Sequence, residues 1–377
     1  MILSLLWTFP LIMLCSIMIG WAAEITAVHL STGIALALLA WLQTTPEFAV
    51  EASIAWSQNS HLVLANLTGS LRLLMGFGWP MVFFIHFLKQ RKKIKRMSDL
   101  DVVLPISFSV EAAGLLAPVL YFVLIFLKGT WTTTDGLILC SLYVFYFWLL
   151  NQQRKKIKVK IESSDDDSEP WVVRKTLSLS VGWQSLITAN LFVLGGGALL
   201  LSVHPFLEGL KEAAAALGVS QYVFIQWIAP IASEFPEKVT AFNWARKEKK
   251  VSMAIVNMLS SVTSQWSLMA GLVPIVFSIS AGHWSTIEFD HFQKTELLLT
   301  IFQSLLAVAF LSDLRVSFAE SLGLFILWIT QFFVPQTREV LIPVYALWFV
   351  LEIVRMVRKP SKMIAWTTVA KVLFSKR

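Results

Sequence analysis

Apolar stretches of about 20 residues recur along nearly the whole chain, and this repetition constrains its fold more than any other feature. A helix of about 20 apolar residues is long enough to span the hydrocarbon core of a bilayer. Hydrophobic residues make up 56% of the chain and charged residues only 15%, whereas a soluble domain carries about 25% charged residues. The sequence therefore predicts an all-α integral membrane protein with many spans.

Eleven membrane spans are expected from these stretches, ten of them forming a core and the last one an extra C-terminal helix. They are residues 3–25, 30–57, 61–88, 103–127, 133–150, 178–203, 218–245, 251–279, 295–312, 316–334 and 339–356. The first stretch lacks the basic residues that begin a secretory signal, since the first Lys or Arg of the chain is Arg72. We therefore expect it to be retained as the first helix.

The formal net charge of +7 comes from basic residues that lie in short clusters between the apolar stretches, which excludes a nucleic-acid-binding surface. Most of these residues fall in connections that the predicted spans place on one side of the membrane. The opposite side has Lys128, Lys211, Lys294 and Arg338. Because cytoplasmic connections carry an excess of Lys and Arg, we expect the C-terminus inside and the N-terminus outside a plasma membrane. The expected partners are the lipid bilayer and small inorganic cations.

One sizeable connection, residues 151–178, divides the chain into two halves. Its acidic run Ser163–Glu169 lacks the alternating acids, the central Gly and the distal Glu of an EF-hand calcium loop. We interpret the connection as a cytoplasmic linker between a first repeat of five spans, residues 1–150, and a second repeat, residues 179–335. Residues 336–377 then form the extra span and a basic cytoplasmic tail.

Each half carries a Pro-Glu pair in its second span, Pro46-Glu47 in the first half and Pro236-Glu237 in the second. About twenty residues later, each half has an Asn followed by small polar residues or Gly. These residues are Asn66, Gly69 and Ser70 in the first half and Asn257, Ser260 and Ser261 in the second. The charge pattern makes the two Pro-Glu spans run in opposite directions across the membrane. The halves are therefore predicted to be inverted repeats, a plan that in secondary transporters places ion sites at the repeat interface.

Proline within a helix donates no backbone hydrogen bond and disrupts the turn before it. Pro46 leaves the carbonyl of Leu42 without its donor, and Pro236 does the same to Ala232. Such carbonyls are tolerated at membrane depth where they line a water-filled cavity. The residue after each proline is a glutamate, which is costly in hydrocarbon and is a functional residue by default. The pattern thus predicts a cation site to which both halves contribute, with the ion held between Glu47 and Glu237.

More oxygen ligands lie close to each Pro-Glu pair. Glu51 is four residues after Glu47, and Glu234 is three residues before Glu237, so each pair shares one helix face. Carboxylates, hydroxyls and freed carbonyls are hard ligands, which Ca²⁺ prefers and Na⁺ accepts. The candidate ion-binding residues are Glu47, Glu237, Glu234, Glu51, Thr44, Thr45, Ser233, Leu42 and Ala232, with Glu47 and Glu237 as the metal ligands. Arg72 and Lys238 are expected as counter-charges.

At these residues the chain resembles the calcium/cation antiporter superfamily, whose members share the membrane region of sodium/calcium exchangers. The family pattern is Gly-Thr-Ser-x-Pro-Glu on the second and seventh helices, each copy followed by Gly-Asn-x-x-Gly-Ser-Asn. The two copies here read Leu42-Gln43-Thr44-Thr45-Pro46-Glu47 and Ala232-Ser233-Glu234-Phe235-Pro236-Glu237. The glycine of the family pattern is absent from both.

The resemblance implies that the two motif glutamates coordinate the transported ion. The hydroxyl that precedes the Pro-Glu pair falls on Thr44 in the first copy and is replaced by Glu234 in the second. A further polar ligand, one turn into the next helix, corresponds to Leu74 in the first half and to Gln265 in the second. The resemblance therefore adds Gln265 to the candidate ligands. The first half has no polar side chain at the corresponding position, because that residue is a leucine.

These features predict a secondary-active cation antiporter without a cofactor, which moves Ca²⁺ or another small cation against Na⁺ or H⁺ by alternating access. Two alternatives stay open. The chain could be a degenerate homologue that acts as a membrane sensor or scaffold. It could also be an intramembrane enzyme that uses Glu234 and Glu237, but the six histidines lie mostly at span ends, and no His-Glu-x-x-His or Gly-x-Ser-x-Gly pattern occurs. The sequence leaves the transported ions and the oligomeric state open.

Overall fold

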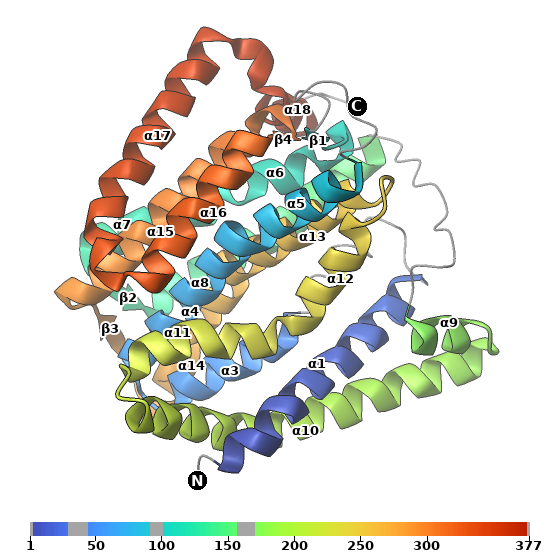
Figure 1. Cartoon of the computed structure of the whole chain (residues 1–377), viewed down its shortest axis with the longest axis vertical. Coiled ribbons are helices and arrows are strands. Elements are labelled where there is room, and N and C mark those ends of the chain that lie inside the picture. Colours follow the sequence, from blue (N-terminus) through green and yellow to red (C-terminus); the bar gives the residue numbers. More distant parts are fainter. Residues whose placement is uncertain (1–2, 29–43, 91–100, 157–169, 375–377) are drawn as a thin grey trace.

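The computed structural model describes residues 3–28, 44–90, 101–156 and 170–374, and helices dominate them (Figure 1). The α-helices are α1 (Leu3–Val28), α3 (Thr45–Trp56), α4 (Ser60–Leu73), α5 (Trp79–Gln90), α6 (Ser109–Gly114), α7 (Leu116–Lys128), α8 (Thr133–Lys156), α9 (Trp171–Leu177), α10 (Val181–Ala216), α11 (Gln221–Ser233), α12 (Phe235–Ala245), α13 (Val251–Ser264), α14 (Ala270–Ala281), α15 (His291–Phe310), α16 (Phe318–Phe333), α17 (Arg338–Arg358) and α18 (Ile364–Phe374). Two π-helices, η1 (Leu74–Gly78) and η5 (Gln265–Met269), continue α4 and α13. Short 3₁₀ turns are η3 (Ile106–Phe108), η6 (Leu311–Asp313), η7 (Pro335–Thr337) and η8 (Pro360–Lys362).

Eight helical stretches in the described part of the chain are long and apolar enough to cross a membrane. They are Ser4–Thr26, Ser60–Gln90, Ile106–Lys128, Thr133–Gln153, Val181–Ala216, Val251–Ala281, His291–Asp313 and Pro335–Arg358. Each corresponds to one predicted span, so the all-α, multi-pass membrane protein is confirmed. The count of ten core helices plus one stays a prediction. The span 30–57 is described only from residue 44, the span 218–245 is divided into α11 and α12, and the span 316–334 is α16, with 16 residues.

Helices α1 and α10 pack along each other at one side of the molecule (Figure 1). The 36 residues of α10 continue well past the predicted end of this span at residue 203. Large apolar side chains of α10, including Leu194, Leu200 and Leu201, are exposed on its outer face. Since apolar side chains gain nothing from contact with water, this face is suited to contact with lipid.

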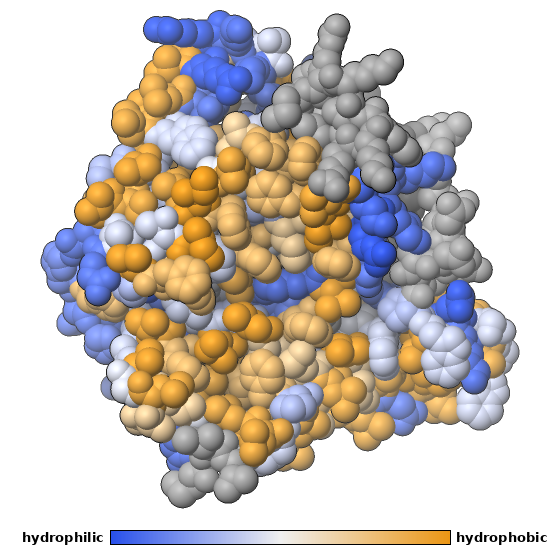
Figure 2. All heavy atoms as spheres, viewed as in Figure 1, coloured by the Kyte–Doolittle hydropathy of each residue, from blue (hydrophilic) through white to orange (hydrophobic). Residues whose placement is uncertain are grey.

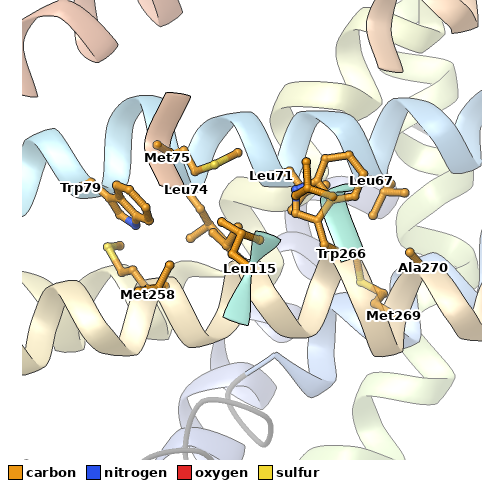
Figure 3. Packing of buried hydrophobic residues seen from close by; sticks show 14 of the residues in the cluster. Leu67, Leu71, Leu74, Met75, Trp79, Leu115, Met258, Trp266, Met269 and Ala270 are labelled. Carbon is orange, nitrogen blue, oxygen red and sulfur yellow. The ribbon is translucent and has the colours of Figure 1, made fainter. Parts of the chain in front are cut away.

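Two long helical rods form the centre of the fold. The first consists of α4, η1 and α5, and the second of α13, η5 and α14. Each has an α-helix of 14 residues, a π-helix of five residues and an α-helix of 12 residues in that order. Apolar side chains such as Leu71, Leu74, Met258 and Trp266 fill the space between the rods (Figure 3). The equal lengths fit the predicted correspondence of the two halves, which stays a prediction.

Two short antiparallel ladders join connections of the first half to connections of the second. Strand β2 (Thr130–Thr132) pairs with β3 (Thr286–Glu288), and β1 (Val102–Val103) pairs with β4 (Arg315–Val316). Each ladder therefore joins a connection of the first half to a connection of the second.

Apolar side chains cover much of the molecular face shown in Figure 2, and hydrophilic residues gather mainly towards its margins. A smaller hydrophilic area lies near the middle of the same face, surrounded by apolar side chains. This distribution is expected for a membrane protein, since lipid covers the apolar band and polar groups inside it need protein or water as partners.

The predicted basic tail contains a helix. Helix α18 packs against α6 and η6 at one end of the molecule. Trp366 donates a hydrogen bond of 2.9 Å to Ser312, and the Lys362 Nζ lies 3.2 Å from Asp313. The tail is therefore folded onto the bundle. The acidic run Ser163–Glu169, interpreted as a linker segment, lies outside the described residues.

Candidate ion-binding site

Each Pro-Glu pair lies in the first turn of a helix. Pro46 and Glu47 are the second and third residues of α3, which begins after Thr44, and Glu237 is the third residue of α12. A proline at the start of a helix sacrifices no hydrogen bond, and a carboxylate there interacts favourably with the helix dipole. Both motifs therefore place a negative charge at a helix N-terminus.

The predicted interruption before Pro236 is present. Helix α11 ends at Ser233 and α12 begins at Phe235, with Glu234 between them. Ala232 lies in the last turn of α11, where carbonyls have no partner within the helix. The corresponding carbonyl of the first motif belongs to Leu42, which lies outside the described residues.

Asn66 on α4 connects two carboxylates of α3. Its Nδ2 donates hydrogen bonds of 2.8 Å to Glu47 and 2.7 Å to Glu51. All three side chains are buried, and one oxygen of Glu51 has no hydrogen-bond partner in the described part of the chain. Glu47 and Glu51 therefore face α4 together, as their helical spacing predicts.

Glu234 receives hydrogen bonds from several directions. Ser70 on α4 donates to its Oε1, and the Nε2 of Gln265 donates to the same oxygen at 2.9 Å. The other oxygen, Oε2, forms an ion pair with Lys238 on α12. Both oxygens of this buried carboxylate thus have partners.

A hydrogen bond between α11 and α3 brings the two motifs together. The hydroxyl of Ser233 donates to Oε2 of Glu47, and both side chains are fully buried. Glu237 lies close enough to Glu47 and Glu234 for their charges to interact. Residues of both Pro-Glu motifs therefore contribute to one buried cluster.

Glu237 differs from the other carboxylates of the cluster. It is fully buried, and neither of its oxygens lies in the geometry of a hydrogen bond with a described residue, although the Ser261 hydroxyl is near enough to interact with it. Ser261 on α13 lies beside it, and Asn257 and Ser260 are buried on the same helix. Burying a charged group without partners is costly, so a charged Glu237 would need compensation that these hydroxyl and amide groups do not fully supply.

The close approach of α4 to α11 depends on Gly69. A Cβ at this position would lie 1.9 Å from the backbone carbonyl oxygen of Gln226. Because only glycine leaves room for this contact, the two helices can approach closely enough for Ser70 to reach Glu234.

Arg72 does not neutralise the site glutamates as the sequence suggested. It pairs with the buried Glu296 on α15, and its Nη1 donates a hydrogen bond of 2.9 Å to Gln331. Arg338, expected in an outer connection, is buried at the start of α17 and lies 2.6 Å from the same Glu296. Gln226 on α11 accepts from Arg338 and donates to Glu296. The long Arg72 side chain thus points along α4 into a second cluster.

Glu296 was missed as a buried residue by the sequence analysis, although a signal was present. It lies within the predicted span 295–312, and an acid at such a place is expensive in hydrocarbon unless it is paired. The pairing with two arginines depends on helix packing, which the sequence pattern does not give.

The remaining candidates are distributed around the cluster. Thr44 is buried, whereas Thr45 is only partly buried. Leu74 and Gln265, matched through the family resemblance, are each the first residue of a π-helix. Such helices frequently occur at functional sites. Among the described residues, no three His, Cys, Asp or Glu side chains form a group that could hold a metal ion.

The family model described as sodium/calcium exchanger protein matches residues 1–151 and 187–334. The chain belongs to this family. The resemblance inferred from the two Pro-Glu motifs is thereby confirmed. The unmatched residues 152–186 of this exchanger-family chain include most of the predicted linker. No curated protein matches the chain.

Several solved structures are similar to this family member over most of its length. The crystal structure of the H⁺/Ca²⁺ exchanger CAX is 32% identical with a TM-score of 0.86, covering 99% of this chain and 92% of that chain. One structure of the sodium-calcium exchanger NCX_Mj is 16% identical with a TM-score of 0.56, covering 89% and 99%. Native YfkE is 16% identical with a TM-score of 0.61, covering 85% and 88%. At such identities the last two show the fold alone.

Proposed function

We propose that this chain is a secondary-active antiporter that exchanges Ca²⁺, or another small cation, for Na⁺ or H⁺ by alternating access. The transported cation is held between Glu47 and Glu237. The observation that carries this proposal is the hydrogen bond from Ser233 to Glu47, which joins the two Pro-Glu motifs in one buried cluster.

The composition of the cluster supports a hard cation as its ligand. Carboxylates, hydroxyls and amide oxygens are the groups that Ca²⁺ prefers, and Na⁺ accepts them too. Glu237 has no hydrogen-bond partner among the described residues, and Ser261 adds a hydroxyl beside it. A cation would compensate the buried charge that this arrangement leaves open.

The predicted architecture agrees with the same function. Two inverted repeats, residues 1–150 and 179–335, would place one Pro-Glu motif on each side of a shared site, as in other secondary transporters. The equal element lengths of the two central rods support the correspondence. The linker 151–178 and the C-terminus are proposed to be cytoplasmic, and the N-terminus external.

The similar structures favour Ca²⁺ as the first cation to test. One is described as an H⁺/Ca²⁺ exchanger and another as a sodium-calcium exchanger. We therefore propose Ca²⁺ as the substrate, with either H⁺ or Na⁺ as the driving ion.

The test is an ion-flux assay with the purified protein in sealed liposomes. Uptake of Ca²⁺ is measured with an outward gradient of H⁺, Na⁺ or K⁺, each in turn. We expect one of these gradients to drive Ca²⁺ uptake by the wild type. The variants Glu47→Gln and Glu237→Gln should lower uptake to the level of protein-free liposomes, because a hard cation needs the anionic oxygens.

The matched control is Glu288→Gln, since Glu288 is an exposed glutamate on β3. This variant should transport like the wild type. Full transport by Glu47→Gln or Glu237→Gln would move the ion site elsewhere. Absence of flux in the wild type under all three gradients would instead support a sensor or scaffold.

A further inference from the structure

Lys238 is a cation that the protein itself places in the acidic cluster. Its Nζ forms an ion pair with Oε2 of Glu234, and the two side chains are 11% and 1% exposed. The charge of Lys238 also acts on Glu47 and Glu237. An ammonium group therefore lies among three carboxylates that belong to both Pro-Glu motifs.

The ion pair spans the first turn of α12 and, unlike most pairs of this spacing, it is buried. Glu234 lies at the break between α11 and α12, and Lys238 lies one turn into α12. The lysine thus reaches back across the helix start towards a residue outside the helix. Exposed pairs of this spacing contribute little, whereas a buried charge needs a partner.

The two acids that precede this lysine in the sequence, Glu234 and Glu237, have opposite environments. Glu234 has both oxygens occupied, by Ser70 and Gln265 on one oxygen and by Lys238 on the other. Glu237 has neither oxygen occupied by a described hydrogen-bond donor. The carboxylate of Glu234 is therefore neutralised by its partners, whereas that of Glu237 is open to an ion.

The charges around Glu234 indicate which ion the Lys238 ammonium replaces. With Arg72 paired to Glu296 in another cluster, it is not available to the site glutamates. A lysine ammonium is a compact single positive charge on a flexible stem, so it resembles a bound monovalent cation. Without it, the charge of Glu234 would require a monovalent cation from solution.

We propose that Lys238 is a tethered cation that occupies the Glu234 side of the site and leaves Glu47 and Glu237 to the transported ion. The lysine takes the position of one monovalent cation and so reduces the number of such ions that the site binds. This inference rests on the proposed function, because it assumes that the cluster binds the transported cation.

The experiment measures equilibrium binding of Ca²⁺ to the purified full-length protein over a range of Na⁺ concentrations at one fixed pH. The dissociation constant is plotted against Na⁺ concentration on logarithmic axes. For Lys238→Gln at low Na⁺, we expect Ca²⁺ to bind on the order of tenfold more tightly, because a positive charge close to the site is removed. The slope of the plot should also become steeper by about one, since one more Na⁺ competes.

Three variants keep the test specific. Lys238→Arg should keep the wild-type slope, because the positive charge stays tethered. The double variant Lys238→Gln/Glu234→Gln should return to that slope, because the carboxylate that would recruit Na⁺ is gone. Lys211→Gln removes a lysine from an ion pair with the exposed Glu208 and should change nothing. If Lys238→Gln does not fold, Lys238→Met carries the same expectation.

Equal dissociation constants and equal slopes for the wild type and Lys238→Gln would overturn the inference while leaving the antiporter proposal intact. A wild type that binds no Ca²⁺ at any Na⁺ concentration would overturn both.

Discussion

Ser233 at the end of α11 donates a hydrogen bond to Glu47 in the first turn of α3, although 186 positions separate the two residues in the sequence. Both side chains are fully buried. The contact connects a residue of the second motif with the central acid of the first. It is the observation that most directly supports the proposal of one shared site.

Replacing Ser233 by alanine should weaken cation binding. A hydrogen bond to a charged group contributes about 1.5–3 kcal/mol, and a site hydroxyl can also be a ligand. We expect the apparent affinity for Ca²⁺ in the flux assay to fall by about tenfold or more, since 1.4 kcal/mol corresponds to a factor of ten. The matched control is Ser141→Ala, which removes an exposed hydroxyl on α8. An unchanged affinity would show that Ser233 does not contribute to the site.

Replacing Asn66 by leucine should destabilise the protein in the absence of divalent cations. The change removes both donors that hold Glu47 and Glu51, and it leaves two buried carboxylates without these partners. Each unsatisfied buried group costs about 1–3 kcal/mol. Thermal unfolding in detergent should therefore occur at a clearly lower temperature than for the wild type.

Asn190→Leu is the control for Asn66→Leu, since Asn190 is an exposed asparagine on α10. It should unfold at the wild-type temperature. If both variants unfold at that temperature, the hydrogen bonds of Asn66 do not stabilise the fold.

Replacing Glu296 by glutamine should be strongly destabilising. Glu296 is the carboxylate shared by the buried Arg72 and Arg338. Removing the charge of one partner from a buried ion pair costs about 3–5 kcal/mol, because the remaining charges lose their compensation. Glu208→Gln, which breaks the exposed pair with Lys211, should cost about 1 kcal/mol or less. Equal unfolding temperatures for these two variants would contradict the structural role of the Glu296 cluster.

Replacing Gly69 by alanine should push α4 away from α11. The added Cβ would lie 1.9 Å from the carbonyl oxygen of Gln226, so the backbone has to move. Overpacking of this kind costs about 1–3 kcal/mol, and the shift would separate Ser70 from Glu234. We expect Ca²⁺ flux to fall together with thermal stability.

The control for Gly69→Ala is Gly197→Ala on α10, where a Cβ would have no neighbour within 4 Å. This variant should keep both flux and stability. Wild-type flux in Gly69→Ala would show that the α4–α11 distance does not matter for transport.

Much of the local structure could be predicted from the sequence. Eight predicted spans correspond to long apolar helices, because a run of apolar residues has few alternatives to a helix in lipid. The break before Pro236 was predictable as well, since proline cannot continue the preceding hydrogen-bond pattern. Helix lengths were less predictable. Helix α10 extends beyond the predicted span because its C-terminal end, rich in alanine, has a high helix propensity.

The assignment of charges to partners could not be predicted. Arg72 and Lys238 looked equivalent in the sequence, as two positive charges in or beside the motif-bearing spans. The structure pairs Lys238 with Glu234, four residues away, but pairs Arg72 with Glu296, which is 224 positions away. A local pair follows from helical spacing, whereas a distant one depends on which helices pack together.

The sequence by itself determined that this chain resides in a membrane and carries two Pro-Glu motifs, because hydrophobicity and proline chemistry act locally. Only the tertiary structure decided that Ser233 donates to Glu47, that Arg72 pairs with Glu296 and that Glu237 is left without a hydrogen bond from the described residues. These contacts join or flank helices whose packing depends on side-chain shape across the whole bundle, including the space left by Gly69. No pattern along a single segment contains that information.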